Sequence, residues 1–254
     1  KNLHESIGCW NKILEITPND AWTLLKKSND LSKIGKTEEA LQCLDKITST
    51  DRKEDDPKEN IILNSKGWIL IQSGKQKEGL KYVEDSLKLD STNPSAMDSK
   101  AVGLFNLEKY EEAKKCYEEK YQITDAELDQ IWIGICMKYC GDQVEENQSE
   151  SKKHYDDAIK VYDLVLEKNN QNDEAWFQKA RVNFDLKKYE ESIKNCQEAI
   201  KIDPNDARYW EEIGDATSMA AKHTQAIIYY TKANEFKNTT YLLTQIASCL
   251  SLNK

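Results

Sequence analysis

A period of 34 residues is the feature that most restricts how this chain can fold. Residues 173–206 and 207–240 align with each other without a gap. Both segments carry tryptophan at the fourth position, and both carry small residues at the eighth, twentieth and twenty-seventh positions: Ala180 and Gly214, Ser192 and Ala226, Ala199 and Ala233. Repeats of this length bury their apolar faces only by stacking on neighbouring repeats. The sequence therefore predicts an array of stacked units.

The same frame extends over the whole chain, which we interpret as a single array over residues 1–254. The predicted repeats are 21–59, 60–93, 94–126, 127–172, 173–206 and 207–240. Residues 1–20 are predicted to hold the second helix of a truncated unit, and residues 241–254 to form a terminal helix. The repeat 127–172 fits only with a loop insertion near residues 142–153, and the charged segment 50–59 is predicted to be a solvated linker.

Two amphipathic segments of about thirteen residues fill each unit, which indicates a pair of helices. Small residues at the eighth and twentieth positions would let the two helix backbones approach each other. The chain has only 9 Gly and 4 Pro in 254 residues, so an architecture of many short strands and tight turns is disfavoured. The sequence predicts an all-α fold of antiparallel helix pairs.

The repeat resembles that of tetratricopeptide repeat (TPR) proteins. The resemblance is carried by Trp176, Ala180, Tyr189, Ala199 and Pro204 in one unit, and by Trp210, Gly214, Ala226, Tyr230 and Ala233 in the next. It implies a right-handed α-solenoid. The chain departs from the family pattern at Thr37, where a large residue is usual, and in the insertion. Because the family is a scaffold used in many pathways, the resemblance implies protein binding and no particular activity.

The family resemblance also implies that the first helix of each unit lines a concave face. Trp22, Trp68 and Trp132 fall at positions directed into this face, whereas the other three tryptophans fall at core positions. Exposed apolar clusters of this kind mark interaction sites; the alternative is that these aromatic residues contact each other or the insertion. The predicted partner-binding residues are Trp22, Trp68, Phe105, Ile131, Trp132, Ile135, Tyr139, Phe177, Arg181 and Phe184.

The family's carboxylate clamp for the acidic C-terminal tails of chaperones requires basic and asparagine residues at set positions of three consecutive repeats. In the first three repeats only Asn29 matches, and no other three consecutive repeats match better. Binding of chaperone tails is therefore excluded from the prediction. The concave face is aromatic in its middle and acidic at its downstream end. An apolar peptide or an amphipathic partner helix with a basic flank would suit such a face.

No set of residues in the sequence resembles a catalytic or metal site. The histidines are far apart, and Cys136 and Cys140 lack a third ligand. Neither a glycine-rich phosphate loop nor a Ser/His/Asp set is present. We predict a protein that is not an enzyme and that has no cofactor and no metal. Seven scattered cysteines indicate a reducing compartment and predict a cytoplasmic location.

The net charge of −9, with lysine and arginine dispersed, predicts no nucleic-acid partner. The absence of a long apolar run predicts no membrane span. The sequence thus favours a protein–protein interaction scaffold that binds a peptide or partner helix in its concave face. Two alternatives stay open: a regulatory or substrate-recruiting arm of a larger multidomain enzyme, and a self-associating assembly module such as a homodimer.

Overall fold

The computed structural model describes residues 2–47, 53–144 and 146–252, and every regular element in these ranges is an α-helix. The predicted all-α helical-repeat fold is confirmed. The chain forms two compact units, residues 1–125 and 126–254, and the division falls within one residue of the predicted boundary between the repeats 94–126 and 127–172. We describe the two units separately.

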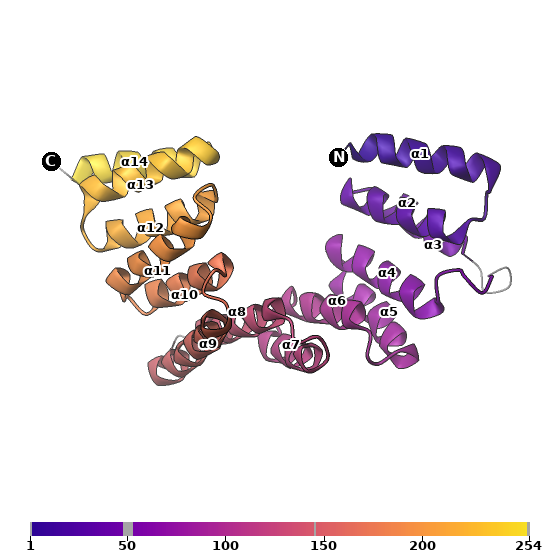
Figure 1. Cartoon of the computed structure of the whole chain (residues 1–254), viewed down its shortest axis with the longest axis horizontal. Helices are drawn as coiled ribbons and strands as arrows, with labels where there is room; N and C mark the ends of the chain where they lie inside the picture. The colour runs from indigo at the N-terminus through magenta and orange to yellow at the C-terminus, as the bar shows by residue number, and fades with distance from the viewer. Residues whose placement is uncertain (1, 48–52, 145, 253–254) are drawn as a thin grey trace. The chain divides into compact units, whose positions relative to one another are not determined.

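The described residues of the N-terminal unit form seven helices that follow one another in chain order (Figure 1). They are α1 (Leu3–Ile16), α2 (Ala21–Lys33), α3 (Thr37–Asp45), α4 (Glu59–Gln72), α5 (Gln76–Leu89), α6 (Pro94–Phe105) and α7 (Tyr110–Thr124). Three hairpins result, α2 with α3, α4 with α5 and α6 with α7, while α1 packs against α2. The first helices α2, α4 and α6 also contact one another in that order.

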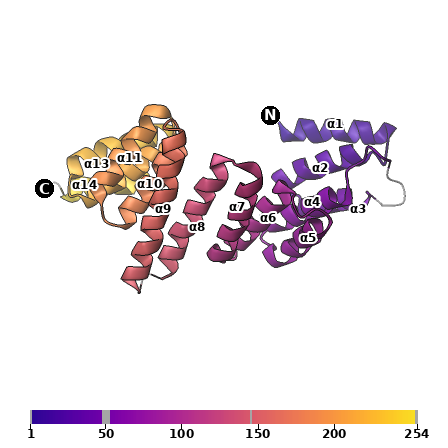
Figure 2. The same cartoon turned by 60° about the horizontal axis from the view of Figure 1, so that its bottom comes forward.

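The C-terminal unit repeats this arrangement with another seven helices. They are α8 (Glu127–Gln143), α9 (Gln148–Lys168), α10 (Asp173–Asp185), α11 (Tyr189–Ile202), α12 (Ala207–Met219), α13 (His223–Phe236) and α14 (Thr240–Leu252). Consecutive helices form hairpins up to α12 with α13, and α14 packs against α13. Figure 2 shows the long α8 and α9 side by side as one hairpin.

Turn chemistry at fixed positions sets the helix ends. The side chains of Asp20, Asn93, Asn172 and Asp206 precede first helices and accept hydrogen bonds from backbone N–H groups two or three residues later. These caps satisfy N–H groups that have no partner inside the helix.

The fifteenth position of each regular repeat has a left-handed backbone, with φ between 58° and 88°: Gly35, Gly74, Glu108, Lys187 and Ala221.

Close backbone contact inside a hairpin explains the small residues at the eighth and twentieth positions. A Cβ atom added to Gly67 would lie 2.5 Å from Val83 Cγ2, and one added to Gly79 would lie 2.5 Å from the carbonyl oxygen of Gly67. The backbones of α4 and α5 therefore approach each other because neither residue has a side chain. The spacing read from the sequence matches this contact.

The predicted loop insertion near residues 142–153 is wrong over most of its length. α8 continues to Gln143 and α9 begins at Gln148, so the insertion lengthens both helices, to 17 and 21 residues. The side chain of Asn147 accepts a hydrogen bond from the backbone N–H of Glu150 and donates one to its carboxylate, which caps α9. Ser151 is buried on the added turn. Residue 145 lies outside the described residues.

Two smaller boundaries also bear on the repeat frame. α14 begins at Thr240, one residue before the predicted terminal helix, because the Thr239 hydroxyl accepts a hydrogen bond from the backbone N–H of Leu242. Residues 50–52 of the predicted linker lie outside the described residues. The later part of the linker, ahead of α4, includes Asp55, whose carbonyl oxygen accepts a hydrogen bond of 2.7 Å from the Trp22 indole.

Candidate partner-binding faces

The first helices of the N-terminal unit form two adjacent hollows, which we call the Trp68 hollows. One, of about 580 Å³, lies between α2 and α4 and is lined by Asn29, Ser65 and Gln72 among others. The second lies between α4 and α6 and includes Ser99. Asn64 and Trp68 line both hollows, and Trp68 is partly exposed between them. Of the ten predicted binding residues, Trp68 is the one that this geometry favours most.

Uncharged polar groups dominate the Trp68 hollows. The Lys120 ammonium is 2.8 Å from an Asp98 carboxylate oxygen, so the charges at one edge neutralise each other. The Asn64 Oδ1 atom is buried without a hydrogen-bond partner. Asn64 therefore has an unsatisfied acceptor beside the partly exposed Trp68 indole. This arrangement fits a ligand with both apolar and amide groups.

Three other predicted aromatic residues make specific local contacts. The Trp22 indole is exposed but is held by the Asp55 carbonyl, as described above. The Phe105 ring packs edge-on against Tyr110 at 4.9 Å between ring centroids, and Phe184 packs in the same way against Tyr189 at 5.6 Å. Phe105 is the last residue of α6 and Phe184 the penultimate residue of α10, and each contacts the first residue of the following helix. These intramolecular contacts explain the three aromatic side chains even if no partner binds. That Trp22, Phe105 and Phe184 bind a partner stays a prediction.

In the C-terminal unit, three residues predicted to face a partner belong to the core. Ile131, Ile135 and Phe177 are all buried. α8 is covered by α9 and α10, and the Phe177 ring packs on Tyr209 at 5.0 Å between centroids. The prediction that these three residues contact a partner is therefore wrong, because their side chains have almost no solvent-accessible area. Trp132, Tyr139 and Arg181 are partly exposed in the same unit.

An ionic cluster joins three helices of the C-terminal unit. The buried ammonium of Lys138 is 2.7 Å from Asp142 and 3.1 Å from Asp185, and the Tyr155 hydroxyl donates a hydrogen bond of 2.6 Å to Asp142. Burial by itself would lower the pKa of Lys138, but the hydrogen bonds and charges of the two carboxylates outweigh burial and raise it. The cluster thus fixes the lengthened α8–α9 hairpin to α10.

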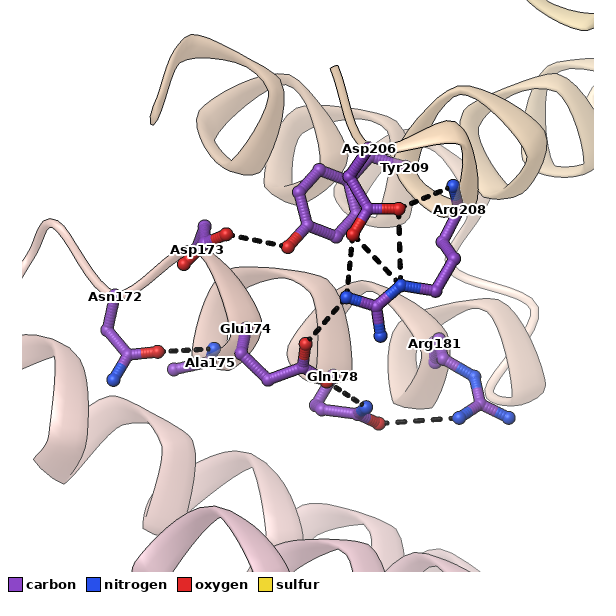
Figure 3. A network of polar contacts seen from close by, with 9 residues as sticks. All are labelled: Asn172, Asp173, Glu174, Ala175, Gln178, Arg181, Asp206, Arg208 and Tyr209. Carbon is purple, nitrogen blue, oxygen red and sulfur yellow. Dashed lines mark hydrogen bonds and ion pairs between the residues drawn. The ribbon is translucent and has the colours of Figure 1, made fainter. Parts of the chain in front are cut away.

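A second polar network joins the starts of α10 and α12 (Figure 3). The Tyr209 hydroxyl donates to Asp173 at 2.7 Å, and Arg208 donates to Glu174 at 3.0 Å and to Asp206. From Glu174 the contacts pass through Gln178 to Arg181, where the last donor–acceptor distance is 3.4 Å. These hydrogen bonds hold α10 and α12 of neighbouring repeats in register. Arg181, a predicted binding residue, is one end of this network.

Acidic residues on α12 have raised pKa values. Burial raises the pKa of Glu212 to about 7; the Arg181 charge opposes this rise and the Asp215 charge adds to it. Burial also raises the pKa of Asp215, against the effect of hydrogen bonds donated by Tyr230 and Tyr241. The C-terminal unit therefore presents charged and polar groups here, whereas the N-terminal unit presents the Trp68 hollows.

Glu212→Gln is expected to stabilise the chain at pH 8 and to have little effect at pH 5. Folded Glu212 keeps its proton up to about pH 7, whereas the unfolded side chain releases it near 4.5. The folded state then binds more protons between these values, so its stability falls as pH rises through this window. The gain at pH 8 should be roughly 1–3 kcal/mol. Urea unfolding from pH 5 to 8 measures it; the exposed Glu167→Gln is the control, and a pH-independent difference would contradict the assignment.

Comparison with known protein families identifies one repeat of this chain. The family model of the tetratricopeptide repeat matches residues 173–206, the repeat that holds α10 and α11. Residues 173–206 thus form a tetratricopeptide (TPR) repeat. The chain is 22% identical over 250 residues to the TPR repeat-containing protein MJ1428 of Methanocaldococcus jannaschii, covering 98% of this chain and 43% of the relative. The chain therefore spans less than half the length of that curated relative.

Solved structures share the helical-repeat fold of this chain. TTC0263, a thermophilic TPR protein of Thermus thermophilus, is 16% identical with a TM-score of 0.62 over 76% of this chain and 99% of its own. Human IFIT1, solved as a dimer with PPP-AAAA, is 19% identical with a TM-score of 0.70 over 99% of this chain and 59% of its own. At these identities the likeness establishes the fold alone.

Of the residues that line the Trp68 hollows, the predicted binding set contains only Trp68. Asn64 lies on the first helix α4 but is not in the predicted binding set. Lys120 was missed because it belongs to the second helix α7. Lys120 is the twenty-seventh residue of its repeat, a position that is apolar and fully buried in three other repeats (Val165, Ala199 and Ala233). A charged residue at this position was the signal that could have identified it.

The part of the chain that the structure describes has neither a metal-ligand cluster nor a membrane-spanning helix. Within residues 2–47, 53–144 and 146–252, no three His, Cys, Asp or Glu side chains are grouped closely enough to hold a metal ion. In those same ranges, no helix combines the length and the apolar character that a membrane crossing requires.

Proposed function

We propose that this chain is a non-catalytic interaction scaffold that binds a peptide or partner helix in the Trp68 hollows. The observation that carries the proposal is the position of Trp68, partly exposed between two hollows on adjacent first helices. Tryptophan is enriched among residues whose truncation weakens binding most, because it buries a large area at a small cost in side-chain entropy.

The chemistry of the hollows indicates the class of ligand. Their polar lining is made mainly of amide and hydroxyl groups. The Lys120 charge is paired with Asp98, and Lys33 of the other hollow is 3.7 Å from Asp30. An apolar side chain of the partner would contact Trp68, while its main-chain amide groups would bond to Asn64 and its neighbours. A largely uncharged peptide segment satisfies both requirements.

We propose a protein ligand in preference to RNA, although the fold is shared with IFIT1, which was solved with PPP-AAAA. The net charge of this chain is −9, so its surface is on balance anionic. Phosphate groups would be repelled by such a surface. A 5′-triphosphorylated oligoadenylate is therefore expected to leave the fluorescence of the chain unchanged at physiological salt.

Trp68→Ala is expected to weaken binding of a selected peptide by about 30-fold, which corresponds to roughly 2 kcal/mol. The ligand would be obtained by displaying random peptides and selecting those that bind the immobilised wild-type chain. Isothermal titration calorimetry of the purified peptide then compares the wild type with the variant. The loss arises because removal of the indole leaves the apolar group of the peptide against solvent.

Leu89→Ala is the matched control, since Leu89 is an exposed apolar residue of α5 in the same unit and lies outside the hollows. It should bind the peptide as the wild type does. Circular dichroism must show equal helix content in all three proteins. Equal affinity of Trp68→Ala and wild type for every selected peptide would reject the Trp68 hollows as the binding face.

A further inference from the structure

The two Trp68 hollows carry charge only on the sides that lie away from α4. Of the residues that line the hollow between α2 and α4, only Lys33 is charged, and of those that line the hollow between α4 and α6, only Asp98 and Lys120 are charged. Trp68 lines both hollows and lies between these charged residues. The charges that a bound ligand can reach on either side of Trp68 therefore determine which charges the ligand can carry.

On the α2 side, the accessible charge is positive. Lys33 forms an ion pair with Asp30 in which the lysine side chain is 63% exposed and the aspartate side chain 15%. The Lys33 Nζ atom is 3.7 Å from one carboxylate oxygen, which is longer than a hydrogen bond. The other oxygen of Asp30 accepts hydrogen bonds from Ser6 and Trp10 of α1. Asp30 is thus held by α1, and the Lys33 ammonium keeps its donors available to a ligand.

On the α6 side, the accessible charge is negative. Asp98 and Lys120 form an ion pair without net charge, but the aspartate side chain is 41% exposed and the lysine side chain 13%. Lys120 donates to the Oδ1 atom of Asp98, whose Oδ2 atom accepts no hydrogen bond within the part of the chain that the structure describes. Because a carboxylate accepts several hydrogen bonds, Asp98 can bind a second cation while it stays paired with Lys120.

We propose that the ligand of the Trp68 hollows is a peptide segment in which an apolar side chain lies between one acidic and one basic residue. The apolar side chain contacts Trp68, the acidic residue pairs with Lys33, and the basic residue pairs with Asp98. This inference rests on the proposed function and adds the charge pattern of the ligand to it.

The spacing of the helices sets the spacing of the two charged residues in the ligand. Packed helix axes are about 8–10 Å apart, so the path from α2 across α4 to α6 is about 16–20 Å. An extended peptide covers this distance in about five or six residues. The part of the peptide that crosses Trp68 is uncharged, and the charges lie at its two ends.

Opposite accessible charges on the two sides make the hollows selective against uniformly charged ligands. A segment with two basic residues places one of them beside the Lys33 ammonium, and a segment with two acidic residues places one beside the Asp98 carboxylate. Contacts between like charges disfavour such partners, whereas each exposed pair of opposite charge strengthens binding modestly. We expect each of the two contacts to contribute about 3- to 5-fold in affinity, and both to weaken as salt is added.

The test uses the peptides selected on the wild-type chain, synthesised with acetylated and amidated ends so that terminal charges play no part. Their sequences should carry an acidic and a basic residue on opposite sides of the apolar residue. Replacing the basic residue of the peptide by alanine should lower its affinity for the wild type about 3- to 5-fold in isothermal titration calorimetry, and so should replacing the acidic residue.

Variants of the full chain assign the two contacts. Lys33→Gln should lose the preference for the acidic residue of the peptide and keep the preference for the basic residue. The double variant Asp98→Asn, Lys120→Met, which leaves neither member of the ion pair without its partner, should show the opposite. Asp85→Asn with Lys88→Gln removes an exposed ion pair of α5 outside the hollows and should bind every peptide as the wild type does.

The outcomes separate this inference from the proposed function. Binding that is lost in Trp68→Ala but is equally strong for charged and alanine-substituted peptides would overturn the charge pattern and leave the hollows as the binding face. Selected peptides with charges of one sign only would also overturn it, as would variants at Lys33 and Asp98 that keep the peptide preferences of the wild type. Binding that does not depend on Trp68 would overturn both proposals.

Discussion

Gly79→Ala is expected to lower the free energy of unfolding of the N-terminal unit by roughly 2–4 kcal/mol. The new methyl group would lie 2.5 Å from the Gly67 carbonyl oxygen and 2.8 Å from Ile71 Cγ1, so α4 and α5 must separate to admit it. Helix propensity acts in the opposite direction, since alanine is favoured over glycine by about 1 kcal/mol inside a helix. Urea unfolding followed by circular dichroism measures the net effect.

Gly8→Ala provides the same substitution in α1 without the clash. Apart from the adjoining residues and backbone of α1 itself, no atom lies within 4 Å of the added Cβ position, so the substitution should stabilise the chain by about 0.5–1 kcal/mol. The two alanine variants should therefore change stability in opposite directions. Stabilisation by both would show that the close backbone contact in the α4–α5 hairpin does not exist.

Lys138→Met is expected to destabilise the C-terminal unit by roughly 2–4 kcal/mol at pH 7. The lysine ammonium is buried and bonded to both Asp142 and Asp185, and its removal leaves two neighbouring carboxylates without their shared cation. The methionine side chain keeps most of the volume, so the loss is mainly electrostatic and does not reflect a cavity. The urea midpoint of the full chain at pH 7 reports the change.

Neutralising both carboxylates separates this cause from a packing defect. Adding Asp142→Asn and Asp185→Asn to Lys138→Met should recover at least half of the lost stability, because no unpaired charge then remains. In the single variant, stability should also rise when the pH is lowered far enough to protonate the carboxylates. A triple variant as unstable as the single one would point to a steric origin.

Much of the fold could be predicted because local rules and the repeat act at the same positions. α1 spans Leu3–Ile16, as the helical pattern of that segment indicated, and the glycine pair Gly67 and Gly79 marks the hairpin contact in the sequence itself. The insertion could not be predicted from charge. Its polar residues include a helix cap at Asn147 and a buried Ser151, and polarity alone does not distinguish a loop from an exposed helical turn.

The candidate site was harder to predict because position in a repeat does not determine exposure. Ile131 and Phe177 occupy positions assigned to the concave face, yet neighbouring helices cover both. Trp68 occupies such a position and is partly exposed, because the residues around it on α2, α4 and α6 are mostly small or polar. Exposure depends on side chains contributed by adjacent repeats, which no single repeat reveals.

The central claim is that a partner occupies the Trp68 hollows, and fluorine NMR of the chain labelled with 5-fluorotryptophan tests it most directly. The six tryptophans give up to six signals, which Trp→Phe variants assign. On addition of a selected peptide, the Trp68 signal should shift, while those of Trp176 and Trp210, whose indoles are bonded to Asn170 and Pro204 carbonyls, should stay in place. A saturated complex in which the Trp68 signal is unchanged would contradict the account.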